Sequence, residues 1–259
     1  RVNNAYSPRR VVERFLLGSE ERVLSGTDLW TCLTCFLCSE RCPSDVRFPE
    51  FARACRRIAS MEVMEELCAH RGIPMALSRM MISRKIKQDR MGWLPEGAKV
   101  SRTGDILYFV GCTPSYDPRV QRVAIALARC LGEAGVDFRI LGNEENCCGN
   151  EIRRMGEQGL FELLSQDNVD LFQKYGINRI MTVSPHCYNV FRNEYPGAGF
   201  EVQHYTQFLA RLIEQGRLVF TKEVKQVVTY QDPCFLGKQN GVFDAPRKII
   251  TSIPGISLV

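Results

Sequence analysis

The sequence predicts two structural classes in one chain of 259 residues, an all-helical first part and an α/β second part. Before about residue 90 the apolar residues recur at helical spacing, whereas from Asp105 short β-rich runs alternate with helical stretches. Such alternation is typical of a parallel sheet with right-handed crossover helices. Pro95, Gly97 and Gly104 mark the linker where we place the boundary.

Helix-start and helix-stop residues define the first part. Ser7 is a typical N-cap, Pro8 suits the first helical position, and Gly18 ends this helix. After a cysteine-rich loop over 31–43, a second helix is expected over 48–71. Residues 75–90 continue helically and become basic. A solvated helix face is the favoured explanation of these charges, and a docking surface for an acidic redox partner or a membrane is the alternative.

The second part contains a repeated pattern. Cys112 and Cys234 each end a predicted strand, and each is followed by a helix that a Pro-Arg pair opens and then by another strand. This pattern predicts a duplicated α/β unit, of which the second copy is cut off. The expected strands are 106–110, 136–141, 179–183 and 226–230, and the expected helices are 118–134, 151–175, 188–194 and 206–216.

Composition excludes several classes of protein. The chain is 45% hydrophobic and 24% charged, which is ordinary for a globular protein, and its net charge of +5 comes without any nucleic-acid-binding motif. No apolar run reaches the roughly 18 residues of a membrane-spanning helix, so membrane association would require a partner. Twelve cysteines without a signal peptide favour a reducing, cytoplasmic setting. The chain starts at Arg1 without methionine and stops at Val259 within a pattern, so we expect a piece of something longer.

The strongest motif is Cys32-x-x-Cys35-x-x-Cys38-x-x-x-Cys42-Pro43. This spacing is typical of a [4Fe–4S] ferredoxin loop, in which the fourth cysteine ligates the other cluster. Zinc is the rival, but it usually takes two separated pairs of ligands, and no histidine is nearby. The missing fourth ligand would come from a motif before Arg1. Alternatively, Cys42 or Cys55 completes the cluster locally, although Cys55 is better explained as a small apolar core residue.

A second group of cysteines follows the predicted strands. Because ligands of an open parallel sheet bind beyond the carboxyl ends of its strands, these thiols are expected to converge although they are far apart in sequence. Four close thiolates would repel one another unless a cation or a cluster neutralised them. Scattered core cysteines are the alternative, and Cys130, on a helix, is assigned to the core. The group consists of Cys112, Cys147, Cys148 and Cys187, with Cys234 later.

The spacing of this second group resembles the cysteine-rich CCG motif of the heterodisulfide reductase family, in its B-type subunits and their relatives. The order, a ferredoxin part before CCG units, resembles the D-type subunits, in which the C and B types are fused. The resemblance implies an α-helical ferredoxin-like domain over 1–100, a first Rossmann-like α/β CCG domain over 105–225, and the start of an incomplete second CCG repeat over 226–259. It also implies [4Fe–4S] clusters, with a non-cubane cluster in the CCG region as the alternative.

One position departs from that family pattern. The pattern ends in Cys-x-x-Cys, and here Ser184 stands at the first of those positions. Four thiolates remain where the family's double cluster uses five, which favours an ordinary cubane that relays electrons. His186 could hydrogen-bond a cluster sulfur, or it is an ordinary loop histidine; for His204 a structural role is favoured over one near the cluster.

These observations predict an iron–sulfur electron-transfer subunit of an oxidoreductase complex. The expected partners are a flavoprotein or a membrane cytochrome or quinone-linked subunit. The expected location is cytoplasmic, with peripheral association at the cytoplasmic face of the membrane as an extension. The alternatives are a catalytic disulfide reductase that acts directly at a CCG cluster and a zinc-stabilised scaffold subunit.

Overall fold

The computed structural model describes residues 6–61, 76, 80, 83, 88–95, 100–101, 103–195, 197 and 199–259. The chain forms two compact units. Unit 1 comprises Arg1–Ser83 with Gly149–Leu163, and unit 2 comprises Arg84–Cys148 with Leu164–Val259. The end of the helix expected over 48–71 and the basic side chains of the run 79–87 lie outside the described residues. The expected domain boundaries stay a prediction.

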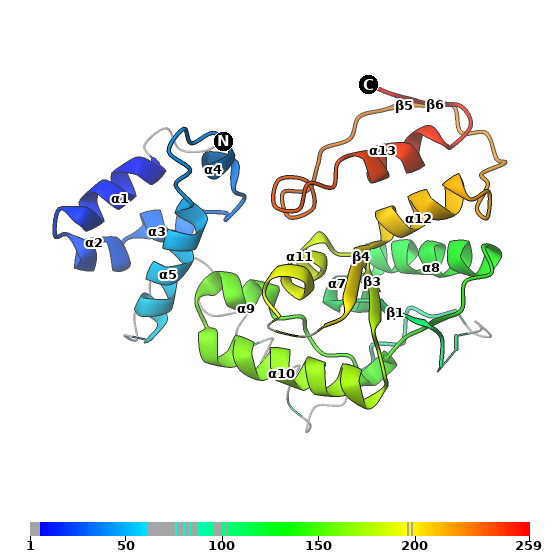
Figure 1. Cartoon of the computed structure of the whole chain (residues 1–259), viewed down its shortest axis with the longest axis horizontal. Coiled ribbons are helices and arrows are strands. Elements are labelled where there is room, and N and C mark those ends of the chain that lie inside the picture. Colours follow the sequence, from blue (N-terminus) through cyan, green and yellow to red (C-terminus); the bar gives the residue numbers. More distant parts are fainter. Residues whose placement is uncertain are drawn as a thin grey trace. The chain divides into compact units, whose positions relative to one another are not determined.

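Unit 1 is helical in its described part, as the sequence predicts (Figure 1). Ser7 lies at the N-cap of the first helix and Pro8 at its first position, but the Ser7 side chain makes no capping hydrogen bond. The expected cysteine loop contains a short helix that was not predicted. A left-handed backbone at Phe36 (φ 64°) lies directly before this helix and reverses the chain there. The helices are α1 (Pro8–Leu16), α2 (Glu20–Leu24), α3 (Thr27–Thr31), α4 (Leu37–Glu40), α5 (Phe48–Met61), α9 (Asn150–Met155) and the start of α10 (Gln158–Lys174).

The core of unit 1 lies between α5 and the shorter helices that precede it. Leu29 and Ala52 are fully buried, and Cys55 is only 2% exposed, as expected of a small core residue. Helix α9 contacts α5 closely at Gly156, whose φ is +89° and where a Cβ atom would lie 2.7 Å from the Arg56 carbonyl oxygen. A segment that follows the paired cysteines therefore packs against the helix that follows the ferredoxin-like motif.

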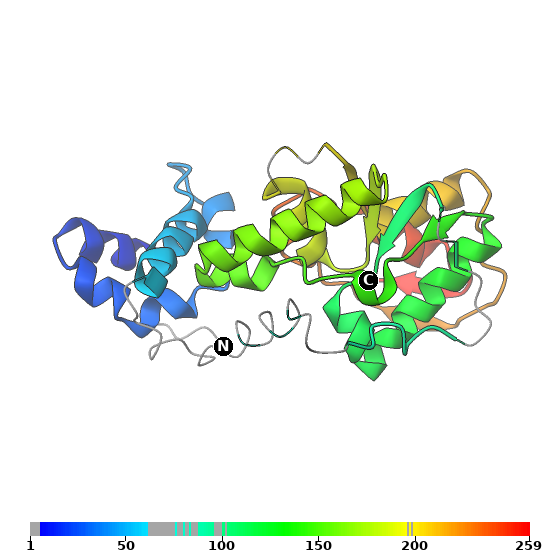
Figure 2. The ribbon, with the colours of Figure 1, turned by 90° about the horizontal axis from the view of Figure 1, so that it is seen from below.

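Unit 2 is built on a parallel sheet, which confirms the predicted α/β class. The main sheet has the strand order β2-β1-β3-β4, with all neighbours parallel, and a second, two-stranded parallel sheet pairs β5 with β6. The strands are β1 (Ile106–Phe109), β2 (Phe138–Arg139), β3 (Arg179–Thr182), β4 (Glu201–His204), β5 (Gln226–Val228) and β6 (Ile256–Leu258). The helices are α7 (Cys112–Tyr116), α8 (Pro118–Glu133), α11 (Pro185–Asn193), α12 (Tyr205–Glu214) and α13 (Asp244–Thr251), with a 3-10 turn η2 at Gly142–Glu144. Figure 2 shows α10, in yellow-green, as one long helix.

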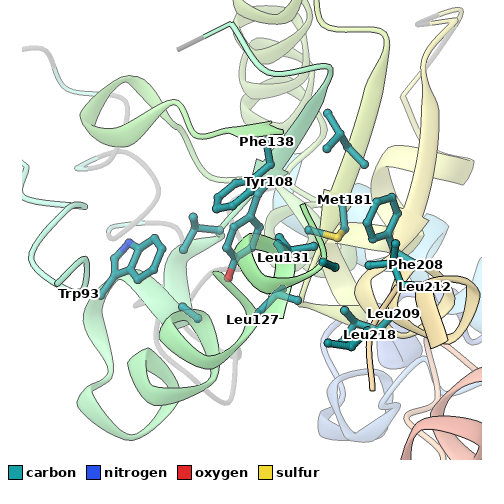
Figure 3. Packing of buried hydrophobic residues seen from close by; sticks show 14 residues of the cluster. Trp93, Tyr108, Leu127, Leu131, Phe138, Met181, Phe208, Leu209, Leu212 and Leu218 are labelled. Atoms are coloured by element: carbon teal, nitrogen blue, oxygen red, sulfur yellow. The ribbon is translucent and has the colours of Figure 1, made fainter. Parts of the chain in front are cut away.

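Helices cover both faces of the main sheet, and successive side chains of β1 pack against them on opposite faces. Tyr108 faces the cluster formed with α8 and α12, where Leu131 and Leu212 are buried (Figure 3). Phe109 faces the other side and stacks edge-to-face on Phe172 of α10 and on a phenylalanine of α11. All four residues of β1 are buried, so the strand is sandwiched between helix layers as in other parallel sheets.

None of the helices in the described part of the chain combines the length and the apolar character that crossing a bilayer requires.

Candidate metal centres

The first cysteine group lies in the loop between α3 and α4 of unit 1. Left-handed backbone at Thr34 (φ 52°) and Phe36 (φ 64°) winds this loop tightly around its thiols. Burial, followed by the negative charge of Cys32 and then of Cys35, raises the pKa of the Cys38 thiol. The structure therefore brings Cys32, Cys35 and Cys38 close enough to interact electrostatically.

Cys42 has a different environment from these three. Its Sγ accepts a hydrogen bond from the Val46 amide at 3.4 Å. With Cys38 it lines an open, mainly apolar pocket of about 820 Å³ between α1 and the loop, beside the exposed side chains of Leu16 and Leu17. The sequence predicts that the fourth cysteine serves another cluster, and its place beside an open pocket is compatible with that role.

Two arginines fix the cysteine loop of unit 1, and sequence reasoning missed both. The buried Arg56 donates hydrogen bonds to the Leu29 carbonyl at 2.8 Å and to the Cys32 carbonyl at 2.6 Å. Arg154 of α9 donates to the Thr34 hydroxyl at 2.8 Å and to the Leu33 carbonyl at 2.7 Å. No local signal identifies these residues, because their partners are 24 to 121 positions away.

The second cysteine group gathers beyond the carboxyl ends of β1 and β3 in unit 2. Cys112 is the first residue of α7, Cys187 lies in the first turn of α11, and Cys147 and Cys148 follow η2. Hydrogen bonding with Cys147, followed by burial, raises the pKa of the Cys112 thiol. Hydrogen bonding with Cys147 and then with Cys187 raises the pKa of the Cys148 thiol. The four thiols are thus mutual neighbours, as the parallel topology predicts.

Specific contacts hold the backbone around these thiols. Gly111 has a φ of +85°, and a Cβ atom at this position would lie 3.5 Å from the Cys187 Sγ. The Asn168 side-chain amide donates to the Cys147 carbonyl at 2.9 Å, and the Tyr195 hydroxyl donates to the Cys148 carbonyl at 3.1 Å. Asn168 and Tyr195, both buried, therefore hold the backbone of the paired cysteines.

A buried ion pair lies beside Cys112, and no sequence pattern pointed to it. Arg90 Nη2 donates to Glu145 Oε1 at 2.8 Å and lies 4.0 Å from the Cys112 Sγ. Glu145 also accepts from the Val110 and Gly111 amides, both at 2.8 Å. The side chains of the pair are 1% and 2% exposed.

The other predicted residues lie around this edge of unit 2. Cys234 is in a turn after β5. Phe235 follows it in the sequence, and the centroid of the Phe235 ring lies 4.5 Å from that of the His186 ring. Ser184 is the N-cap of α11, and its side chain makes no capping hydrogen bond. His204 uses both ring nitrogens within the fold, one 2.8 Å from the Val183 carbonyl oxygen and the other 2.7 Å from the Thr206 hydroxyl.

The donor set fits a sulfur-ligated cluster. Both groups consist of cysteines, and thiolates are the ligands of iron–sulfur clusters. Among the described residues, no three histidine, cysteine or carboxylate side chains are placed to hold a single metal ion. In a [4Fe–4S] cluster each thiolate binds a different iron atom, so the thiols need not converge on one point as they do around a single metal ion. An all-cysteine donor set is the set that an iron–sulfur cluster requires.

Comparisons with known proteins give a consistent result. The model of the CCG cysteine-rich domain matches residues 106–192. The chain is 34% identical to the probable iron-sulfur-binding oxidoreductase FadF of Bacillus subtilis, over 92% of this chain and 36% of that protein. It is 34% identical to the EtfAB:quinone oxidoreductase of Syntrophomonas wolfei, over 90% of this chain and 34% of that protein. It is 32% identical to the D subunit of the dihydromethanophenazine:CoB–CoM heterodisulfide reductase of Methanosarcina mazei, over 90% of this chain and 58% of that protein.

No solved structure gives a significant match. The chain spans between about a third and three fifths of the length of these curated relatives. The matched cysteine-rich segment contains all four thiols gathered at the strand ends of unit 2, and the relatives align over nearly all of the chain. The chain belongs to the family of CCG-domain iron–sulfur oxidoreductases.

Proposed function

We propose that this chain is the iron–sulfur electron-transfer portion of an oxidoreductase complex. Cys32, Cys35 and Cys38 would hold a [4Fe–4S] cluster in unit 1, with Cys42 serving a neighbouring cluster. Four further thiols would hold a second cluster in unit 2. When bound, such clusters accept and release one electron at a time, and the protein tunes their potential through ligation, hydrogen bonds and burial.

The observation that carries the proposal is the convergence of thiols from three separate segments in unit 2. Cys112, the Cys147–Cys148 pair and Cys187 come from different strand ends, yet hydrogen bonding between them raises the pKa values of Cys112 and Cys148. Thiols with raised pKa values would stay protonated without metal. Their gathering in a buried place is explained if iron replaces those protons and neutralises the thiolates.

Iron and acid-labile sulfide analysis of anaerobically purified protein tests this function. We expect both elements, together with an electron paramagnetic resonance signal after reduction with dithionite. Cys148→Ala should lose part of the iron and one signal. The matched control is Cys130→Ala, on α8 away from the gathered thiols, which should keep both. Zinc without sulfide would reject the proposal and favour the scaffold alternative.

A direct disulfide reductase is the second candidate, and one relative favours it by its name, which is that of a heterodisulfide reductase. Ser184 lies at the N-cap of α11, three residues before Cys187, where the family pattern has a further cysteine. We expect Ser184→Cys to alter the cluster spectrum if this position separates a relay from a catalyst. An unchanged spectrum and unchanged disulfide reduction would show that it does not.

The partners follow from the relatives' names and remain part of the proposal. One relative is named as an EtfAB:quinone oxidoreductase, which favours a flavoprotein donor and a quinone-linked acceptor. Another is named as a probable membrane-anchored ferredoxin, which favours association with a membrane. Co-purification of the full-length protein with a flavoprotein, and its release from membranes by salt, would test these two assignments.

A further inference from the structure

Arg90 is a buried side chain beside the thiols of unit 2, and its hydrogen-bonding capacity is largely unused. The guanidinium carries five N–H donors, and its Nη2 binds Glu145 and approaches Cys112. Its Nε and Nη1 are buried without a hydrogen-bond partner among the described residues. Leaving buried donors unsatisfied costs about 1–3 kcal/mol each, so a fold that keeps them calls for an explanation.

The environment holds this guanidinium in one position. The Arg90 amide donates to Asn143 Oδ1 at 2.7 Å, and the Tyr116 ring lies under the guanidinium, with its centroid 5.6 Å away. Trp93, three residues on, is buried in the core against Tyr108. The side chain therefore has little freedom to turn its unused donors elsewhere.

Neither substrate binding nor a purely structural ion pair accounts well for Arg90. A substrate-binding arginine needs access, and this side chain is 1% exposed. A structural ion pair with a carboxylate is usually bidentate, whereas here only Nη2 faces Glu145 and the second carboxylate oxygen is taken by the Val110 amide. The gathered thiols lie beside this guanidinium, because its Nη2 is 4.0 Å from the Cys112 Sγ.

We propose that Arg90 is the positioning residue that donates hydrogen bonds to the sulfur of the unit 2 cluster and offsets its negative charge, with Glu145 holding it and limiting that effect. This inference rests on the proposed function, because it requires a cluster on Cys112 and its neighbours. When one electron enters, the cluster becomes more negative by one unit and no bond breaks. A fixed cation beside it favours the reduced form and raises the reduction potential.

The charge of Arg90 is secure at physiological pH. A guanidinium is not deprotonated in proteins, and here the Glu145 carboxylate lies 2.8 Å from it, so Arg90 stays charged. The pair therefore places a permanent cation 4.0 Å from the Cys112 Sγ, with the Glu145 carboxylate as its counter-ion. Removing the charge of Arg90 should lower the reduction potential, and removing the charge of Glu145 should raise it. A merely structural pair would not give these opposite shifts.

Redox titration of the full-length, anaerobically purified protein, followed by electron paramagnetic resonance, tests the inference. The signal of the unit 2 cluster is the one lost in Cys148→Ala. For Arg90→Gln we expect the equilibrium constant for reduction to fall at least tenfold, which is about 59 mV for a one-electron couple. Arg90→Lys should recover most of this loss, and Glu145→Gln should raise the potential.

The matched control is Arg217→Gln. Arg217 is an exposed arginine of unit 2 that donates to the Ala134 carbonyl, directly after the C-terminal end of α8, so its loss should leave the potential unchanged. If Arg90→Gln keeps its iron and its potential, or if the control shifts equally, the inference is overturned. If Arg90→Gln loads no iron, Glu145→Gln decides, and a potential that this change does not raise overturns the inference. Wild-type protein without iron and sulfide would overturn the proposed function itself.

Discussion

Replacing Arg56 by methionine should weaken unit 1 and loosen its cysteine loop. The side chain is 4% exposed and its three nitrogens donate to three carbonyl oxygens, those of Leu29, Cys32 and Arg154. Methionine fills a similar volume with no donor, so the change removes the hydrogen bonds while largely keeping the packing.

The magnitude follows from the carbonyls left behind. Leu29 is fully buried and Cys32 is 9% exposed, so their oxygens would find no water. Each buried acceptor left unsatisfied costs about 1–3 kcal/mol, and the third, at Arg154, is partly exposed and costs less. We expect the free energy of unfolding to fall by about 3–5 kcal/mol.

Urea unfolding and iron release to a chelator, both measured without oxygen, check this expectation. Arg57→Met is the matched control, because Arg57 is the next residue of α5 and is exposed. It should change stability by no more than about 0.5 kcal/mol. An Arg56→Met protein that unfolds at the wild-type urea concentration and keeps its iron equally long would refute the reasoning.

Three further changes test individual contacts through urea unfolding. Burial lowers the pKa of His204 from 6.5 to about 4, so the neutral ring stabilises the fold above pH 6.5. This contribution is lost as pH falls toward 4, about 2 kcal/mol of it by pH 5. His204→Gln should remove that part of the pH dependence, and an unchanged pH profile would contradict it. Gly156→Ala should lower the free energy of unfolding more than Gly176→Ala does. Both glycines have positive φ, but only at Gly156 would the added Cβ atom press on the backbone of α5. Equal losses of stability would argue against this contact. Tyr195→Phe removes the hydroxyl that donates to the Cys148 carbonyl, so it should lower the free energy of unfolding by about 1–3 kcal/mol. Tyr175→Phe, whose hydroxyl binds an exposed carboxylate, should cost less, and the reverse order would count against this interpretation.

The sequence predicted best those elements that are long and periodic. The helix expected over 118–134 is observed at Pro118–Glu133, and that expected over 206–216 at Tyr205–Glu214. Helices of four or five residues, such as Leu37–Glu40, contain too little of a helical period to be recognised. The strand expected over 136–141 is reduced to Phe138–Arg139 at the edge of the four-stranded sheet, where a single bridge to Ser101 supports its outer side.

Candidate ligands were accessible to sequence reasoning, but their supports were not. The gathering of Cys112 and Cys187 follows from parallel topology alone, since carboxyl ends of neighbouring strands meet at one edge. Arg90 and Arg154 depend instead on which way a side chain points from a segment 22 or 120 positions away. Nothing in the local pattern distinguishes such an arginine from the solvated ones around it.

The two cysteine groups differ in how much of the chain must be synthesised before they form. Cys32, Cys35 and Cys38 lie within seven consecutive residues, so a nascent chain can present them to a scaffold protein early. Cys112 and Cys187 are 75 positions apart and meet only after β1 and β3 have paired, which is a slow, non-local step. If both groups hold clusters, as proposed, we expect the thiols of unit 1 to be available for insertion before those of unit 2. The four thiols of unit 2 can come together only after α11, which carries Cys187, has been synthesised.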